Sequence, residues 1–157
     1  MLPENFLNSD TVATDVDIQS KKRLLEVIAE LLSGQNPQLD VIEIFEKLIE
    51  RERLGSTGLG KGIALPHARI TNLEQAQAVF IRLQDGIDFD SIDNQPVDLV
   101  VALLVPVDAN EQHLKILAGL AGFFNNDDNC KKIREISDHQ HIIDSVSYTH
   151  LRAHETT

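Results

Sequence analysis

The stretch Val97–Val105 reads VDLVVALLV and decides the fold class of this chain. It is almost entirely apolar and rich in β-branched residues, which is typical of a β-strand covered on both faces. Two shorter strand candidates precede it, at Ile63–Leu65 and at Ala78–Leu83, where alternate residues are apolar. We therefore expect a sheet that other elements cover on both sides.

Helical patterns flank these strands, and two of them begin with clear capping residues. Ser20 can cap a helix whose apolar residues recur with a 3.6-residue period, and Gly34 and Pro37 can end it. Asp40 and Glu43 form a capping box for a second helix, which a glycine at position 55 can stop. This places the arginine at position 51 in the last turn of the second helix.

Further helices are expected after the apolar strand. Asp108 and Glu111 form another capping box, which starts a helix that reaches Phe124. Shorter helices are expected near Asn129–Ile136 and from Ser137 through Val146. Helices and strands that alternate irregularly predict a layered α/β sandwich with a mixed sheet.

Size and charge limit the function classes. We expect the 157 residues to form one domain at residues 1–146, followed by a disordered tail at 147–157 whose native origin is open. A net charge of −11 argues against nucleic-acid binding, which needs clustered cations. The single cysteine fits a reducing cytoplasm. We expect no signal peptide, because the N-terminal MLPENFLNSD has no positive flank followed by an apolar core. We expect no membrane insertion, because the longest apolar run, Leu99–Val105, is too short to span a bilayer.

A glycine-rich loop lies between the second helix and the first strand candidate. Residues Arg51–Arg69 read RERLGSTGLGKGIALPHAR. Glycines allow backbone N–H groups to approach an anion closely, and hydroxyl groups can add hydrogen bonds to it. The residues expected to bind phosphate in this loop are Ser56, Thr57, Gly58, Gly60 and Gly62.

Two other interpretations of the loop stay open. Gly55–Lys61 matches most of a nucleotide-binding P-loop, but Gly62 replaces the hydroxyl residue that should hold magnesium, and the order of strand and helix is reversed. A tight turn from helix to strand explains several glycines without any ligand. It does not explain why two hydroxyl residues and a lysine lie among them.

Three side chains are candidates for the chemistry itself. His67 follows Pro66, which restricts the preceding residue to extended geometry, and an imidazole held in this way can accept a phosphoryl group. Arg51 can hold phosphate oxygens with two parallel hydrogen bonds. His113, in the first turns of the third expected helix, can donate a hydrogen bond to a phosphoryl group near the helix N-terminus. For both histidines a purely structural role remains the alternative.

No pattern predicts a metal or a cofactor. His139 and His141 lie two residues apart, and the chain has one cysteine and no pair of histidines at metalloprotease spacing. The acidic residues between Asp85 and Asp98 resemble a calcium loop only loosely, because Ile92 stands where an oxygen ligand belongs. A solvated loop explains them better.

Three segments of the chain resemble the fructose/mannitol-type IIA domains of the bacterial phosphotransferase system, and most closely their nitrogen-regulatory branch. They are GSTGLGKGIALPHA at Gly55–Ala68, FDSIDNQPVDLVVALLVP at Phe89–Pro106 and EQHLKILAGLAGFF at Glu111–Phe124. The segment QSKKRLLEVIAEL at Gln19–Leu31 is also similar, and the resemblance covers about residues 5–146. It implies a three-layer α/β/α sandwich with a central mixed sheet and helices on both faces.

The resemblance also implies roles for the candidate residues. His67 is implied to be the phosphorylated histidine, His113 the second histidine of the site, and Arg51 its arginine, with no cofactor. Departures are modest: Ala68 stands where many members have glycine, and Lys61 replaces a common asparagine. Neither change removes a group that the chemistry needs.

Partners follow from the same resemblance. The implied phosphoryl donor is a small histidine phosphocarrier protein (HPr-like or NPr-like), supplied from phosphoenolpyruvate through an enzyme I. The favoured function is a phosphorylation-dependent regulator of nitrogen or potassium metabolism, acting on potassium-transport or sensor-kinase components. The alternative is a sugar-specific IIA component that passes phosphate to a IIB partner during uptake.

Overall fold

The structure is a computed structural model that describes residues 6–109 and 111–155, with side chains described as far as residue 147. Its elements, in chain order, are a short 3-10 helix at Ser9–Thr11, β1 (Val12–Val16), α1 (Lys21–Gln35), α2 (Val41–Arg53), β2 (Gly58–Gly60), β3 (Ile63–Ala64), β4 (His67–Ile70), β5 (Gln77–Ile87), β6 (Val97–Pro106), α3 (Glu111–Phe124), α4 (Asp127–Glu135) and α5 (His139–Glu155).

The sheet is mixed, as the sequence predicts. Among the described residues it has six strands, in the order β1-β5-β6-β3-β2, with β4 also paired to β6. Strand β1 runs parallel to β5, and β3 and β4 run parallel to β6, whereas β5 and β6 are antiparallel. The predicted central strand is confirmed, because β6 is buried along nearly its whole length.

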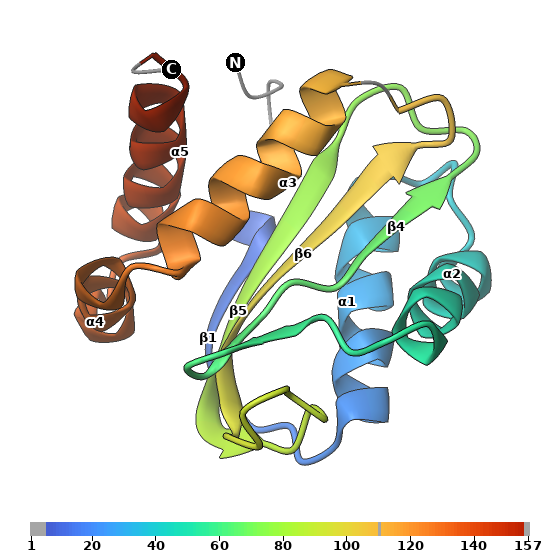
Figure 1. The fold of residues 1–157 in the computed structure, drawn as a ribbon. Coiled ribbons are helices and arrows are strands. Elements are labelled where there is room, and N and C mark those ends of the chain that lie inside the picture. Colours follow the sequence, from blue (N-terminus) through green and yellow to red (C-terminus); the bar gives the residue numbers. More distant parts are fainter. Residues whose placement is uncertain (1–5, 110, 156–157) are drawn as a thin grey trace.

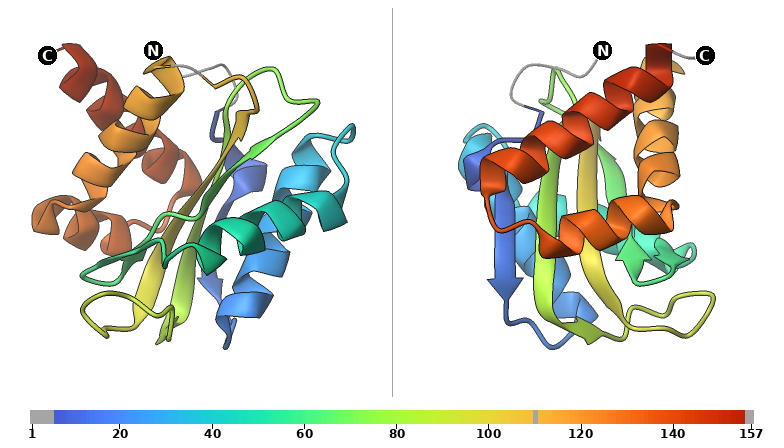
Figure 2. Two further views of the ribbon diagram at one scale, coloured as in Figure 1. Left: turned by 45° about the vertical axis from the view of Figure 1, so that its right-hand side comes forward. Right: turned by 90° about the vertical axis from the view of Figure 1, so that its left-hand side faces the viewer.

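Helices cover both faces of the sheet. Figures 1 and 2 show α1 and α2 on one side and α3, α4 and α5 on the other. Leu24 of α1 and Ile44 of α2 belong to the core on the first side, and Leu120 and Phe124 of α3 belong to the core on the second. Full burial of one such side chain stabilises the fold by about 1.5–3 kcal/mol. The predicted three-layer α/β/α sandwich is confirmed.

The two helices of the first layer begin where the sequence predicts. The Ser20 side chain accepts a hydrogen bond from the Arg23 N–H at 3.1 Å, and the Asp40 side chain accepts one from the Ile42 N–H at 3.2 Å. Helix α2 ends at Arg53, so position 51 lies in its last turn as expected. The capping box predicted for α3 includes residue 110, which lies outside the described residues.

Two short strands share one edge of β6. Strand β3 pairs with Leu99 and Val100, whereas β4 pairs with residues 103–106 of the same strand. Between them the Leu103 N–H donates to the Pro66 carbonyl at 2.9 Å, so the pairing with β6 resumes directly after the proline. The sequence predicts a strand that ends at Leu65 and misses β4, because proline ordinarily interrupts a strand pattern.

The N-terminal strand and the C-terminal end differ from expectation. Strand β1 was not predicted: it is a segment of five residues at the edge of the sheet, and its register with β5 shifts between Ala13 and Val16. Helix α5 extends to Glu155, beyond residue 147 where the sequence predicts the tail to begin, and buried Ile142 and Val146 anchor its first half. Within the described residues, no helix combines the length and the apolar character that a bilayer crossing requires.

Candidate functional site

A groove of about 400 Å³ lies between α2 and α3, above β4 and the end of β6. In Figure 1, β4 runs between these two helices. The three residues predicted to carry the chemistry, His67, His113 and Arg51, all line this groove. Its other lining residues are Lys47, Glu50, Leu54, Ala68, Arg69, Leu103, Val105, Ala109, Leu114 and Leu117. The structure therefore gathers residues that are more than 60 positions apart in the chain.

His67 is the first residue of β4 and is half-buried. Its Nδ1 lies 2.9 Å from the Leu65 carbonyl oxygen. A carbonyl can only accept, so Nδ1 must carry the hydrogen of this bond. In the neutral ring the other nitrogen, Nε2, then holds the lone pair. The imidazole is oriented by the backbone two residues upstream, and Nε2 is its nucleophilic atom.

Arg51 reaches the groove from the last turn of α2. Its Nη1 donates to the Gly55 carbonyl at 2.8 Å. This bond uses one of the five N–H groups of the guanidinium and fixes the direction of the side chain, while the fork of remaining donors keeps its capacity for an anion. The predicted position of this arginine in the second helix is confirmed.

His113 lies in the first turn of α3 and is half-buried. Leu117, one turn further along the helix, lines the same groove, and Leu120 continues this face into the core. The sequence predicts that His113 faces the sheet side of its helix, and the groove confirms this orientation. Both imidazoles and the guanidinium thus face one cavity from three different elements.

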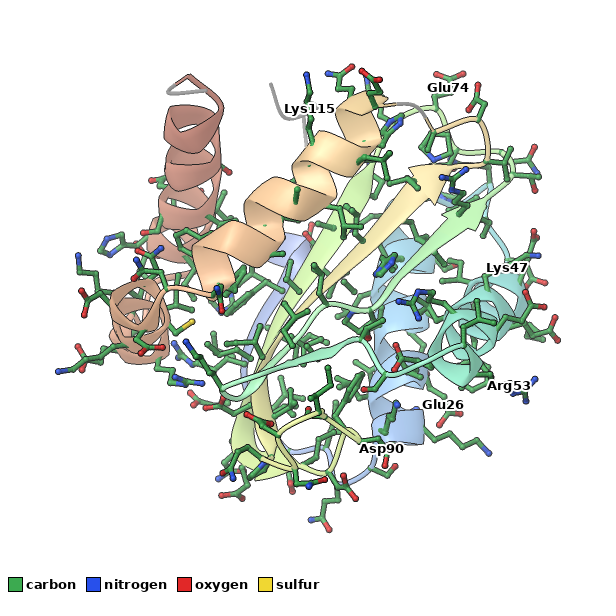
Figure 3. All side chains as sticks on the ribbon, in the orientation of Figure 1. Glu26, Lys47, Arg53, Glu74, Asp90 and Lys115 are labelled. Atoms are coloured by element: carbon green, nitrogen blue, oxygen red, sulfur yellow. The ribbon has the colours of Figure 1, made fainter. Side chains whose placement is uncertain are left out.

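The groove carries positive charge on a strongly acidic protein. Lys47, Arg51 and Arg69 line it against a single carboxylate, that of Glu50, whereas the whole chain has a net charge of −11. Figure 3 shows Lys47 on α2, the helix that forms one wall. A cluster of cations in a concave, partly apolar site attracts anions and concentrates them there. The charge of the groove is suited to a phosphoryl group.

The glycine loop lies elsewhere. None of Ser56, Thr57, Gly58, Gly60 and Gly62 is among the residues that line the groove. The three glycines are buried, and a Cβ at these positions would meet Ser91, Asp93 and the side chains of Arg134 and Asp98, respectively. The loop therefore packs against the segment that precedes β6 and against α4, and the groove does not include it.

Several amide groups of this loop already have partners. The Thr57 N–H donates to the Glu52 carboxylate at 3.2 Å, and the Gly58 N–H donates to the Ser56 hydroxyl at 3.0 Å. The Lys61 N–H donates to Asp93 Oδ2 at 2.8 Å. Together with the Gln95 N–H, this bond holds the pKa of the Asp93 carboxyl below its usual range, because both favour the charged form. The anions that this loop binds in the structure are carboxylates of the protein itself.

Sequence reasoning missed the groove residues that supply its walls and its extra charge. One face of α2 and its C-cap carries Lys47, Glu50, Arg51 and Leu54, at i, i+3, i+4 and i+7 counted from Lys47. The signal that could have found the three missed residues is this helical spacing, which includes Arg51. Arg69 lies two residues beyond His67 in β4, so it faces the same side of the strand.

No metal site accompanies the groove in the part of the chain that the structure describes. Within residues 6–109 and 111–147 no group of three or more histidine, cysteine or acidic side chains is arranged to hold a metal ion. The Nε2 atom of His139 instead lies 3.2 Å from the Thr14 hydroxyl, where α5 contacts β1.

Comparisons with known proteins show the family of the chain. Residues 5–148 match the family described as the phosphoenolpyruvate-dependent sugar phosphotransferase system, EIIA 2. The chain belongs to this family. A nitrogen regulatory protein of Klebsiella oxytoca is 40% identical over 144 residues, covering 91% of this chain and 88% of that protein. The resemblance seen in the sequence is thus confirmed at the level of the family.

A solved structure and a second relative complete the comparison. The crystal structure of nitrogen regulatory protein IIA-Ntr from Neisseria meningitidis superposes with a TM-score of 0.86 at 37% identity, covering 90% of this chain and 96% of that one. A fructose-specific EIIA component of Haloferax volcanii is 32% identical over 128 residues, covering 82% of this chain and 83% of that protein. The family thus includes both regulatory and sugar-specific relatives of this chain.

Proposed function

We propose that this chain accepts a phosphoryl group on Nε2 of His67 from the phosphohistidine of a carrier protein, and that its phosphorylation state regulates partner proteins. The observation that carries the proposal is the groove. In it the Nδ1–H of His67 donates to the Leu65 carbonyl, and the imidazole shares one cavity with Arg51 and His113. Membership of the EIIA family supports it. The proposed donor is an HPr-like or NPr-like carrier, and the proposed location is the cytoplasm, where such carriers act.

The transfer is a displacement at phosphorus between two imidazoles. The Nε2 lone pair of His67 forms the new N–P bond while the N–P bond of the donor breaks, and the donor ring keeps that electron pair. Bond making and bond breaking are alike, so positioning and charge stabilisation supply most of the catalysis. Arg51 and His113 are the groups placed to offset the charge of the transferring oxygens. The step needs neither a metal nor a nucleotide.

Regulation follows from the charge that the modification adds. A phosphoryl group brings negative charge and strong acceptor oxygens into a groove whose rim is cationic. A partner that docks over this groove therefore meets a different surface before and after transfer. The proposed targets are potassium-transport or sensor-kinase components. The similarity to a nitrogen regulatory protein supports a regulatory role for the chain.

The test of the acceptor is the replacement of its imidazole. We expect His67→Ala to abolish phosphorylation and to leave the fold intact, because the side chain is only half-buried. Mass spectrometry after incubation with phosphoenolpyruvate, enzyme I and carrier gives the readout. His141→Ala, which removes an exposed histidine of α5, is the matched control. An undiminished phosphoryl adduct in the His67 variant would defeat the assignment.

A second candidate function is sugar uptake, and the similarity to the fructose-specific EIIA component supports it. In this case phosphorylated His67 would pass its group to a cysteine of a IIB partner. Incubation of the labelled phosphoprotein with fructose-type and mannitol-type IIB proteins separates the two. Rapid transfer of label to IIB favours uptake, whereas partners that bind only one phosphorylation state and take no label favour regulation.

A further inference from the structure

We infer that Glu52 is a positioning residue, which sets the His67 imidazole and the Arg51 guanidinium through one loop, Gly55–Thr57. This inference rests on the proposed phosphoryl transfer and deepens it. Glu52 does not line the groove. It lies in the last turn of α2 and binds Thr57, a residue of the loop that the sequence singles out for phosphate, and it thereby gives this loop a different task.

Glu52 is a buried carboxylate with a full set of partners. Its side chain is 5% exposed. It accepts the Thr57 N–H at 3.2 Å and also the Thr57 hydroxyl, and the Lys21 ammonium pairs with it at 2.9 Å. A buried charge destabilises the folded protein unless it is paired and hydrogen-bonded, and the Glu52 carboxylate meets both conditions. Thr57, itself buried, is thus fixed to the end of α2.

Two hydrogen bonds of the Leu65 backbone carry this constraint to the imidazole. The Leu65 N–H donates to the Thr57 carbonyl at 3.0 Å. The Leu65 carbonyl then accepts the Nδ1 hydrogen of His67 at 2.9 Å. The position of Thr57 therefore decides where Leu65 lies, and Leu65 decides both the tautomer and the direction of the ring. Pro66 stiffens the connection, since it restricts Leu65 to extended geometry.

The same loop holds the guanidinium. Arg51 Nη1 donates to the Gly55 carbonyl. The Gly55 N–H in turn donates to the backbone carbonyl of Glu52 at 3.1 Å. Glu52 and Arg51 are neighbours in α2, so one side chain enters the core network and the other enters the groove. A loop held at Gly55 and at Thr57 thus aligns both groups of the site at once.

Lys21 anchors the network to the rest of the protein. Its ammonium lies 4.5 Å from the centroid of the Phe89 ring, and the Phe89 carbonyl accepts the Ser56 hydroxyl at 2.8 Å. The start of α1, the end of α2, the loop and the segment before β6 therefore meet at a single ion pair. A displacement of a reacting group by about one ångström can slow a reaction by about 100-fold. Loss of this network should therefore have a measurable effect on the transfer rate.

The experiment compares Glu52→Gln with Glu46→Gln, an exposed position on the same helix. Histidine-selective ¹⁵N labelling and two-bond ¹H–¹⁵N spectra at about pH 8.5, above the ordinary range of histidine, report which nitrogen of His67 carries the hydrogen. We expect Nδ1–H in the parent protein and in Glu46→Gln, and a mixture of tautomers in Glu52→Gln. The rate of transfer from phosphorylated carrier should fall roughly 10- to 100-fold in Glu52→Gln only.

A second pair of variants decides the matter if Glu52→Gln does not fold. Thr57→Val removes the hydroxyl donor to Glu52, and Thr57→Ser restores it in the same place. We expect slower transfer and a mixed tautomer in the first and recovery of both in the second. Parent-like tautomer and rate in Glu52→Gln, or in Thr57→Val where Glu52→Gln does not fold, would overturn the inference. A parent protein that takes no phosphoryl group would instead defeat the proposed function, while the spectra would still test the positioning.

Discussion

The groove between α2 and α3 and the glycine loop beside it use their polar groups in opposite ways. In the groove, three cationic side chains face a cavity with one carboxylate. In the loop, backbone amides are bound to carboxylates and hydroxyls of the same chain, as at Thr57 and Lys61. Donors that already have strong acceptors are not available to a ligand. The groove is built to receive an anion, and the loop is built to hold its neighbours in place.

This difference explains why the two regions adjoin. A phosphoryl site needs cationic groups that are not neutralised by the protein, yet their directions must be fixed to a fraction of an ångström. The loop supplies this rigidity from behind, through the Gly55 and Leu65 carbonyls that hold Arg51 and His67. We therefore expect substitutions in the groove to change the rate of phosphoryl transfer. Substitutions in the part of the loop that contacts Ser91 and Asp93 should instead change the free energy of unfolding.

The largest effect within this comparison is expected from Arg51→Ala. It removes the guanidinium that offsets charge on the transferring oxygens, so we expect the transfer rate to fall on the order of 100-fold. Rapid-quench measurement with phosphorylated carrier gives the rate, and mass spectrometry should still find the modification on His67. Arg53→Ala, on the exposed side of the same helix end, is the control. Equal rates in the two variants would leave Arg51 as a structural residue.

A smaller effect is expected from His113→Ala. Its imidazole lies in the first turn of α3, where the helix already favours an anion, so part of the stabilisation remains after its loss. We expect transfer to slow by about tenfold, at the scale of one hydrogen bond to a charged group. His113→Gln, which keeps a donor, should recover much of the rate. Recovery by glutamine and loss in alanine together identify a hydrogen bond, whereas loss in both identifies packing.

Much of the fold could be predicted from the sequence because its signals are local. The buried strand Val97–Val105, the caps Ser20 and Asp40 and the helical periods each act over a few residues, and each is found where expected. Strands β1, β2 and β4 could not be predicted in this way. They are short segments on sheet edges, and pairing with β5, β3 and β6 specifies them rather than their own pattern.

The site was predicted in part for the same reason. His67, His113 and Arg51 could be chosen by residue type and resemblance, and the structure brings them into one groove. The glycines were chosen by what glycine permits, which is close approach of backbone to an anion. Sequence could not show that the approaching groups are Ser91 and Asp93, because these contacts join segments about 30 residues apart.

Gly60→Ala tests the loop side of the comparison. Gly60 has φ of +90°, and an added Cβ would lie 3.1 Å from Asp93 Oδ2. Such a backbone conformation costs an alanine about 1–3 kcal/mol, so we expect urea denaturation to show a loss of about this size and transfer by the folded protein to stay unchanged. Gly34→Ala in α1 has open space and should raise stability by up to about 1 kcal/mol. Equal stability changes in the two variants would contradict the assigned strain.

The smallest effect concerns Asp93, the exposed carboxylate that accepts the Lys61 and Gln95 N–H groups. These bonds lower its pKa from an ordinary value of 3.8, so the folded state holds its proton less readily than the unfolded chain does. The resulting stability is present above the unfolded value and is lost as the pH falls through the folded one. Asp93→Asn should therefore be slightly less stable than the parent at neutral pH, with a gap that closes below about pH 3.8. Urea midpoints measured from pH 7 to pH 3 give this gap. A gap that stays constant over the whole range would show that the Asp93 charge does not hold the loop, and that Glu52 and packing hold it instead.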